Sequence, residues 1–378
     1  AVYSRRQLEA VLTDFWYNHF NVDAGGGLAR YYLIPYVRDT IRPHVLGRFE
    51  DLLLATARAP AMLDYLDNKV NYKEGYVLGG KVRGLNENYG RELLELHSVS
   101  VGAGYTQNDV REAARCLTGW SIDGTYATDG FRFRAAGHDQ DPKQVMGLSF
   151  PAGGGEQEGV DLLSYLAHHP MTAEHVSRKL VTRFVSENPP QALVDAAADT
   201  FLATDGDLRA VVRVILNSPE FLDPANFRTK VKRPLVYTAS MLRAMAPTIA
   251  PEDQAALLKK LAQKILEMGE PLYQFPAPIG FPDVSGFWVG GGTLINKFNT
   301  THDVAAGNGK LTVDWGIAGG TPAQIAETLI ARLFLGGVSA DSRAELTAFA
   351  GSIPGATDEV RVAETASVAL SLPEYLLH

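Results

Sequence analysis

The segment Asp207-Leu-Arg-Ala-Val-Val-Arg-Val-Ile-Leu-Asn217 indicates the fold class most clearly. Its apolar residues recur at spacings of three and four, which places them on one face of an α-helix. They are Leu208, Val211, Val212, Ile215 and Leu216. Proline disfavours helix in the residue before it, so we expect this helix to end at Ser218-Pro219.

Similar amphipathic patterns extend in both directions from this segment. Thr321-Pro322-Ala323-Gln324 adds a strong start signal, because it combines an N-cap, a first-turn proline and a capping-box glutamine. The sequence therefore predicts a mainly α-helical protein, a multi-helix globular bundle. The predicted helices cover residues 5–21, 46–58, 86–98, 108–117, 160–167, 173–186, 191–203, 207–217, 233–246, 251–268, 322–334, 343–350 and 358–370.

Two stretches interrupt the helical pattern. Residues 121–155 contain the alternating run Phe131–Arg134 and a second apolar run, Val145–Phe150, which together predict a small β-hairpin insertion around 130–150. Residues 269–300 form an aromatic, Gly- and Pro-rich loop, which we expect to close over the functional site. We expect residues 1–300 to form the main helical domain. Residues 301–378 would form a C-terminal helical segment, either packed on that domain or separate.

Composition excludes several classes of protein. The chain has 378 residues, a formal net charge of −8 and 46% apolar residues, which is ordinary globular usage and unlike a nucleic-acid binder. No apolar run approaches the roughly 18 residues that a membrane-spanning helix needs. The single cysteine, Cys116, cannot form an intrachain disulfide, and we expect it in the core. The chain begins without Met, which suggests a processed or truncated protein.

A polar cluster at Asn86–His97 is the main candidate for function. On a helix, Asn88, Glu92 and Glu95 share one stripe, whereas His97 falls on another face. Arg91 lies four residues before Glu95, close enough to pair with it. The stripe is either a solvated helix surface or a row of carboxylates that faces a substrate.

Acid/base cleavage of a glycosidic bond needs two carboxylates that flank the bond. Two acids on one stripe point the same way, so we expect the second acid to come from another element. The candidates are Asp139 and Asp141 in the polar stretch His138–Lys143. The predicted catalytic residues are therefore Glu92, Glu95 and Asp139.

A metal site is the alternative interpretation of the same residues. His19, His97 and His138 could coordinate a divalent metal together with a carboxylate from Glu92, Glu95 or Asp139. No His-Glu-x-x-His motif occurs, and a single His among leucines is more often a hydrogen-bonded core residue. We therefore predict no cofactor and leave a divalent metal open. The basic run Lys230–Arg233 before Pro234 predicts an exposed helix start.

These polar motifs resemble a bacterial family catalogued as domain of unknown function 1800. The resemblance covers roughly residues 5–300 and departs at Tyr17, where the family often has His, and at Val236, where it often has Glu. Family members commonly carry a longer N-terminal region. The resemblance implies an exported protein, periplasmic or extracellular, often encoded beside a sulfatase-like or phosphatase-like partner. Its motifs are Asp14–Phe20, Asn86–His97, Gly104–Val110, Leu117–Trp120, His138–Gly147, Lys179–Val185, Thr204–Arg209, Ser218–Phe221 and Met268-Gly269.

Together, these observations predict an exported or envelope-associated enzyme that cleaves a polysaccharide as a hydrolase or lyase. Two alternatives remain, a non-catalytic scaffold of the cell envelope and a metal-dependent hydrolase or oxidoreductase. Besides the substrate, an N-terminal fragment or a second chain could be a partner, whereas nucleic acid is not expected. The expected stacking platforms for sugar rings are Trp16, Tyr89, Trp120 and Trp288; the expected orienting residues are His19, Asn88, Arg91, His97, His138 and Lys143.

Overall fold

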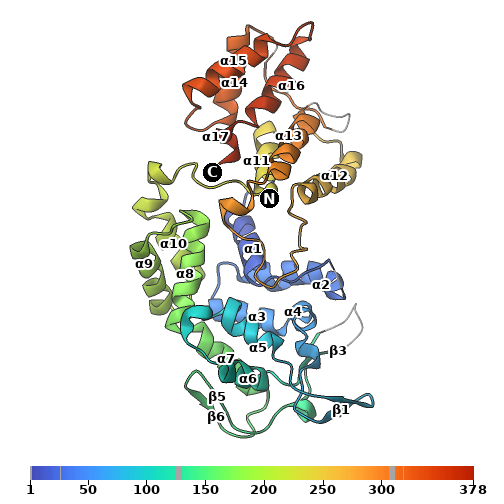
Figure 1. Cartoon of the computed structure of the whole chain (residues 1–378), viewed down its shortest axis with the longest axis vertical. Coiled ribbons are helices and arrows are strands. Elements are labelled where there is room, and N and C mark those ends of the chain that lie inside the picture. The colour runs from blue at the N-terminus through green and yellow to red at the C-terminus, as the bar shows by residue number, and fades with distance from the viewer. Residues whose placement is uncertain (1, 26, 124–129, 306–310, 318) are drawn as a thin grey trace. The chain divides into compact units, whose positions relative to one another are not determined.

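The computed structural model describes residues 2–25, 27–123, 130–305, 311–317 and 319–378. It confirms the predicted class, because helices dominate and the strands form only small two-stranded sheets (Figure 1). The chain divides into two compact units. The larger unit comprises residues 6–223 and 273–282, and the smaller comprises 1–5, 224–272 and 283–378. None of the described helices combines the length and apolar character needed to cross a bilayer.

The larger unit is built mainly from helices, among which α8, α9 and α10 pack against one another. The segment of residues 207–217 forms α10 as predicted, with the Asp207 side chain capping the helix start. The helices of this unit are α1 (Gln7–His19), α2 (Ala29–Pro35), η1 (Tyr36–Ile41), η2 (Arg42–His44), α3 (Phe49–Arg58), α4 (Pro60–Tyr65), η3 (Asn68–Val70), α5 (Asn88–Glu92), η4 (Leu93–His97), η5 (Val101–Ala103), α6 (Gln107–Cys116), η6 (Ala135–Gly137), α7 (Glu156–Ala167), α8 (Pro170–Phe184), α9 (Gln191–Ala203), α10 (Leu208–Leu216) and η7 (Pro219–Phe221).

The β-insertion is more divided than the sequence suggested. Its two runs do not pair with each other. Phe131 pairs with Ile122 in the antiparallel hairpin β3–β4, and Val145 pairs with Leu148 in the hairpin β5–β6. A third hairpin, β1–β2, turns at Gly79-Gly80 and was not predicted. The strands are β1 (Tyr76–Leu78), β2 (Lys81–Arg83), β3 (Trp120–Asp123), β4 (Gly130–Phe133), β5 (Lys143–Val145) and β6 (Leu148–Phe150).

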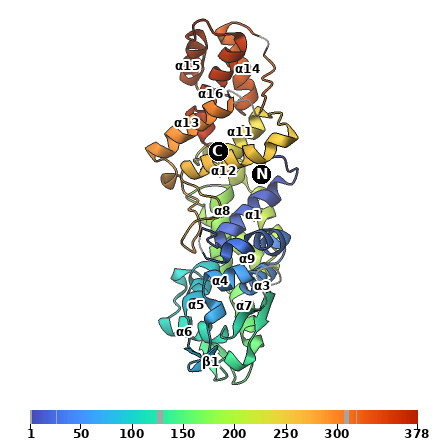
Figure 2. The same ribbon diagram turned by 90° about the vertical axis from the view of Figure 1, so that its right-hand side faces the viewer.

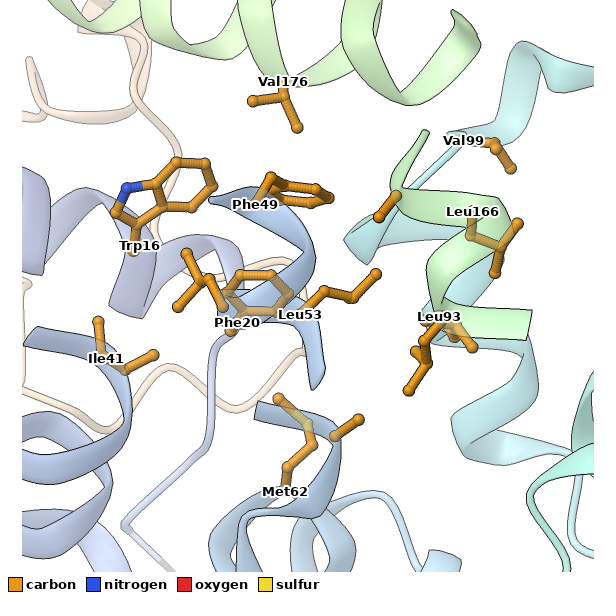
Figure 3. Close-up of a cluster of buried hydrophobic side chains, with 14 of the residues drawn as sticks. Trp16, Phe20, Ile41, Phe49, Leu53, Met62, Leu93, Val99, Leu166 and Val176 are labelled. Atoms are coloured by element: carbon orange, nitrogen blue, oxygen red, sulfur yellow. The ribbon is translucent and has the colours of Figure 1, made fainter. Parts of the chain in front are cut away.

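Aromatic rings from α1 and α3 form the centre of the core of the larger unit (Figure 3). Trp16 of α1 and Phe20, the residue that follows α1, both contact Phe49 of α3, with ring centroids 5.8 and 6.3 Å from that of Phe49. The indole N–H of Trp16 donates a hydrogen bond to the carbonyl oxygen of Val45, so the polar edge of this buried ring is satisfied. Cys116 is also buried here, as expected.

The smaller unit has its own core, which includes Tyr237 and Leu329. Helices α14, α15 and α16 pack against one another within it, as both views show (Figures 1 and 2). The capping box of Thr321 and Gln324 forms as predicted. The helices are η8 (Pro224–Asn226), α11 (Pro234–Met245), η9 (Pro251–Asp253), α12 (Gln254–Glu267), η10 (Ser285–Phe287), α13 (Gly291–Ala305), α14 (Pro322–Leu333), α15 (Ala340–Gly351), α16 (Asp358–Ala369) and α17 (Pro373–Leu376).

The units do not divide at residue 300, where the sequence placed a boundary. Helix α13 runs through that position, and its Gly291–Ala305 span also shortens the expected loop of residues 269–300. The remaining loop is shared, because residues 273–282 belong to the larger unit and residues 283–290 to the smaller one. Apolar periodicity did not indicate α13, since its first turn contains two glycines and its middle is polar.

Helices α5 and α6 approach each other closely at Gly90. A Cβ at this position would lie 2.8 Å from the amide nitrogen of Ala114 and 2.9 Å from the carbonyl oxygen of Val110. We expect Gly90→Ala to lower the free energy of unfolding by about 1–3 kcal/mol, because neither backbone atom can move without shifting α6. Gly102→Ala is the control, since an added Cβ there meets nothing within 4 Å. Urea denaturation of both variants tests this, and equal stabilities would contradict the close approach.

Candidate functional site

The predicted polar cluster lies where α5 continues into the π-helix η4. Single π-helical turns inside α-helices occur frequently at functional sites. Two hydrogen bonds close this turn. The Ser98 hydroxyl donates to the carbonyl oxygen of Leu93 at 2.5 Å, and the backbone N–H of Ser100 donates to the carbonyl oxygen of Leu94. Asn88 begins α5, where its own backbone N–H donates to the side chain of Asn86.

Glu92 and Glu95 lie next to each other on this segment and have different electrostatic surroundings. Burial raises the pKa of the Glu92 carboxyl, the negative charge of Glu95 raises it further, and Arg91 opposes both effects. Glu92 therefore holds a proton more readily than an ordinary glutamate side chain does. The raised pKa is the behaviour that a general acid requires near neutral pH.

Arg91 does not form the ion pair with Glu95 that the four-residue spacing suggested. Its guanidinium lies 3.4 Å from the carboxylate of Glu87 and donates to the side chain of Gln107 at 2.9 Å. The π-helix begins at Leu93 and widens the turn, so residues four apart across it are no longer stacked.

A tyrosine from another helix is affected by the charges of both Glu92 and a second acid. The pKa of Tyr65, at the end of α4, is raised to about 12 by burial and then by the charges of Asp23 and Glu92. Both carboxylates therefore lie within electrostatic range of the Tyr65 hydroxyl. Tyr105 responds similarly, because burial and the charges of Glu95 and Glu92 raise its pKa. No sequence pattern singled out Asp23, which follows α1 in an irregular segment.

Residues 273–282 of the aromatic loop pack against this group. The side-chain amide of Asn21 donates to the carbonyl oxygens of Phe275 and Ala277, both at 2.9 Å, and the Tyr65 hydroxyl donates to that of Pro276 at 2.7 Å. Gly280 has a φ of +71°, and a Cβ there would lie 2.3 Å from the carbonyl oxygen of Asn18. This part of the loop therefore rests directly on the end of α1 and on Tyr65.

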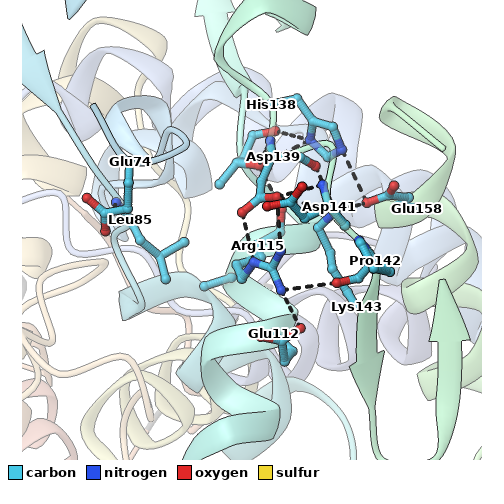
Figure 4. A network of polar contacts seen from close by, with 12 residues as sticks. Glu74, Leu85, Glu112, Arg115, His138, Asp139, Asp141, Pro142, Lys143 and Glu158 are labelled. Atoms are coloured by element: carbon cyan, nitrogen blue, oxygen red, sulfur yellow. Dashed lines mark hydrogen bonds and ion pairs between the residues drawn. The ribbon is translucent and has the colours of Figure 1, made fainter. Parts of the chain in front are cut away.

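His138 and Lys143 belong to a separate, fully buried ionic network (Figure 4). The Lys143 ammonium lies 2.7 Å from the Glu158 carboxylate and donates to the carbonyl oxygens of Asp139 and Asp141 at 2.7 and 2.8 Å. His138 donates from Nε2 to the same Glu158 carboxylate at 3.2 Å and contacts Thr118 through Nδ1. These bonds satisfy Lys143 and Glu158 inside the protein, as buried charges require.

Asp139 is held by Arg115 of α6. The guanidinium donates to both carboxylate oxygens of Asp139, at 2.8 and 3.0 Å, and also pairs with Glu112 at 2.6 Å (Figure 4). Burial opposes ionisation of Asp139, but these hydrogen bonds outweigh it and hold its pKa below the ordinary value. Asp139 pairs with Arg115 and lies 3.9 Å from the Lys143 ammonium, whereas the charges that act on Glu92 are those of Glu95 and Arg91. Arg115 therefore engages Asp139, and the joint action of Asp139 and Glu92 on one bond stays a prediction.

Three histidines gather around the end of η4. His19 of α1 donates from Nε2 to the carbonyl oxygen of His97 at 3.2 Å, and His175 of α8 donates from Nε2 to that of Leu96 at 3.3 Å. The Lys179 ammonium donates to Nδ1 of His19 at 2.8 Å, which assigns the neutral Nε2–H tautomer to that ring. These side chains therefore cap carbonyls that the end of the helix leaves without an internal partner.

The ring of His97 itself is different. It is fully buried, and within the described residues neither of its nitrogens has a hydrogen-bond partner. Burial, followed by the charge of Lys179, lowers the pKa of His97 to about 3 and that of His175 to about 4. The pKa of His19 is also lowered well below its ordinary value by burial and by Lys179. The three imidazoles are therefore neutral at physiological pH.

Comparison with protein families shows to which family the chain is related. Residues 1–377 match the family described as "Protein of unknown function (DUF1800)". The chain belongs to this family. No curated protein and no solved structure gives a significant match to this DUF1800 chain. The resemblance seen in the motifs is thus confirmed over nearly the whole sequence, while the family description names no activity.

The aromatic residues of the DUF1800 motifs lie inside the protein. Trp16 and Trp120 are 0% exposed, Tyr89 is 1% exposed and Trp288 is 2% exposed. None of these rings presents a face to solvent, which corrects the expectation that they stack sugar rings. Bulky rings in polar motifs resemble binding platforms in a sequence, but here they fill space beneath the motifs.

The described residues do not support the metal centre that was left open for His19, His97 and His138. His138 bonds to Glu158, away from the contacts of the other two rings, and His19 uses both of its nitrogens within the protein. No group of three or more His, Cys, Asp or Glu side chains among the residues described is arranged to hold a metal ion.

Proposed function

We propose that this DUF1800 protein is an enzyme that cleaves a polyhydroxylated polymer, such as a polysaccharide, by carboxylate acid/base catalysis. The observation that carries the proposal is the pair of neighbouring acids on the π-helical turn. Burial and the charge of Glu95 raise the pKa of Glu92, so that one acid is biased toward the protonated form beside a second carboxylate. Environments that separate the pKa values of two acids assign the roles of general acid and ionised partner.

Asp23 replaces Asp139 as the acid contributed by another element. Asp23 lies in the segment after α1 and Glu92 in α5, and the negative charge of each raises the pKa of the Tyr65 hydroxyl. Two carboxylates within electrostatic range of one tyrosine hydroxyl suit a substrate that binds beside this tyrosine. In this proposal Glu92 protonates the leaving group, and Asp23 or Glu95 activates the attacking water.

The polar and aromatic side chains around these acids favour a carbohydrate. Tyr65 and Tyr105 are partly exposed and Tyr273 is 40% exposed, so they replace the buried tryptophans as rings that can contact a sugar. Their rings offer apolar faces with a hydroxyl at one edge, which is a common arrangement in binding surfaces. An exported location, inferred from the family resemblance, would bring the protein to such polymers and is part of the proposal.

Substitution of the two acids on a panel of purified polysaccharides tests this function. We expect Glu92→Gln to reduce the rate of cleavage by about 10²–10⁴-fold, because the amide cannot donate the proton. Asp23→Asn should also reduce the rate. Glu87→Gln is the matched control, since Glu87 lies one turn before Arg91 and pairs with it. Reducing ends and unsaturated products are measured to separate hydrolysis from elimination, and a folded Glu92→Gln variant with full activity would contradict the assignment.

A non-catalytic scaffold is the second candidate. The network around Lys143 and Glu158 favours it, because a scaffold is expected to bury its polar motif residues in satisfied pairs. The two candidates differ at Glu92. A scaffold gives no reason for polymer cleavage to depend on that side chain, whereas the enzyme requires it.

A further inference from the structure

Three cations in the smaller unit are held without any carboxylate. Arg228 donates to the carbonyl oxygens of Gly337 and Leu335 at 2.9 and 2.8 Å. The Lys232 ammonium donates to the carbonyl oxygen of Tyr375, and the Lys297 ammonium to that of Lys232, both at 2.7 Å. In the part of the chain that the structure describes, none of these three side chains forms an ion pair.

Aromatic rings supply the other contacts of the same cations. Lys232 Nζ lies 4.0 Å from the centroid of the Tyr375 ring, and Lys297 Nζ lies 5.4 Å from that of Tyr237. The Arg228 guanidinium lies 4.8 Å from the Phe227 ring centroid. Ring faces and carbonyls stabilise a cation only partially, and they leave its full charge available to a ligand.

The acids of the surrounding segments are engaged elsewhere. Glu270 pairs with Arg233 at 2.8 Å and accepts from the backbone of Leu235. The side chain of Glu374, next to Tyr375, accepts from Ser339 and Ser342. The basic run of residues 230–233 was expected to be an exposed helix start, and it does precede α11, but Lys230 is 6% and Arg233 5% exposed.

The cations repel one another in this setting. Burial lowers the pKa of Lys232 to about 8, with further lowering from the charges of Arg228 and Lys297. Burial also lowers the pKa of Lys297 to about 8, opposed by Glu270. A bound anion would relieve this repulsion. Arg228 also has a φ of +57°, an uncommon conformation for a side chain of this size and one found more often at functional sites.

We propose that Arg228, Lys232 and Lys297 form a binding site for an oxyanion, namely a phosphate, sulfate or carboxylate group. Arg228 and Lys232 are partly exposed and contact the anion, whereas Lys297 is 0% exposed and supplies charge from behind Lys232. The Arg228 guanidinium lies 5.8 Å from the Phe334 ring centroid, and that centroid is 5.8 Å from that of Tyr375, the ring that Lys232 contacts, so the two cations lie beside neighbouring rings. Oxyanions are the natural ligands of such a guanidinium and ammonium pair. This site belongs to the smaller unit and is independent of the carboxylates proposed for catalysis.

Calorimetric titration of the full chain with inorganic phosphate, sulfate and acetate, at concentrations up to about 10 mM, tests the site. This range lies below that in which excluded salts stabilise proteins in general. We expect saturable binding, and Lys232→Gln should weaken it by about tenfold or more, because a charged hydrogen bond is lost. Lys232→Arg should retain binding, and Lys260→Gln on the exposed side of α12 should bind like the unaltered protein. The three arms show whether the site selects tetrahedral anions or carboxylates.

A labelling experiment on the unaltered protein keeps the test valid if Lys232→Gln fails to fold. Acetic anhydride modification, followed by peptide mass spectrometry, reports the reactivity of individual lysines. Whichever anion binds should protect Lys232 and leave Lys260 unprotected. If the cations serve only to attach the C-terminal segment, no anion will bind saturably and the two lysines will respond alike. Either of those results, or unaltered affinity in a folded Lys232→Gln variant, overturns the proposal.

Discussion

Lys143→Met should lower the free energy of unfolding by about 3–5 kcal/mol, the cost of breaking a buried ion pair by removing one partner. The substitution leaves the Glu158 carboxylate, which is 2% exposed, with His138 as its remaining side-chain partner. It also leaves the carbonyl oxygens of Asp139 and Asp141 without the ammonium group. Denaturation in urea, followed by tryptophan fluorescence, measures the loss.

A double variant separates the free-energy cost of an unpaired buried charge from the net contribution of the ion pair to stability. Lys143→Met combined with Glu158→Leu removes both charges, and we expect it to recover a large part of the lost stability. Arg132→Gln is the control, because its ion pair with Asp123 is half exposed and should contribute less than about 1 kcal/mol. Equal destabilisation by the single and double variants would show that packing, and not charge burial, determines the effect.

The fold class could be predicted because its signals are local. One apolar face defined α10, with Leu208 and Ile215 buried as the spacing required, and the capping box at Thr321 marked the start of α14. Hydrophobic periodicity depends only on neighbouring residues, so a single sequence contains it. The same reasoning recognised Phe131–Arg134 as strand, but it could not identify the partner, because pairing in a sheet joins residues that are distant in the chain.

The candidate site was harder to predict because its geometry depends on a change of helix type. Spacing rules for an α-helix paired Arg91 with Glu95, but the π-helical turn starting at Leu93 leaves Arg91 with Glu87. Tertiary packing then brought Asp23 and Tyr65 to Glu92, and no pattern in the sequence connects these positions. The sequence therefore identified Glu92 and Glu95 as candidate residues, but it did not predict which side chains surround them.

The charged and aromatic motif residues fall into two physical classes in the structure. Trp120, His138 and Lys143 are buried, and His138 and Lys143 both bond to Glu158, which suits a role in specifying the fold. Glu92 is only partly buried and has a raised pKa, which suits chemistry. A motif rich in polar residues does not by itself distinguish these classes, because both need the same residue types. The cost of burying a charge distinguishes them, and that cost is set only by the folded structure.

Acidification should destabilise the larger unit through the histidines at the end of η4. The pKa of His97 is lowered to about 3 and that of His175 to about 4, whereas an imidazole in an unfolded chain titrates near 6.5. As the pH falls below about 6.5, the unfolded chain therefore takes up protons that the folded chain excludes, and stability is lost. At pH 5 each of these two groups should cost about 2 kcal/mol, or about 4 kcal/mol together. Above about pH 7 they should have no effect.

Hydrogen exchange of peptides from α1 and α8 at pH 7.5 and pH 5.0, corrected for the intrinsic exchange rate, measures this loss within the unit concerned. His97→Phe should reduce the pH-dependent part by about 2 kcal/mol, because phenylalanine has no proton to exclude and its ring suits the contact with Phe20, whose centroid lies 5.2 Å from that of His97. His44→Gln is the control, a substitution of a partly exposed histidine outside the cluster at the end of η4. Carboxyls with lowered pKa values, such as that of Asp139, contribute equally to all three proteins and cancel in the comparison. An unchanged pH dependence in His97→Phe would mean that the ring takes up its proton in the folded state, and hence that water or another acceptor reaches its nitrogens.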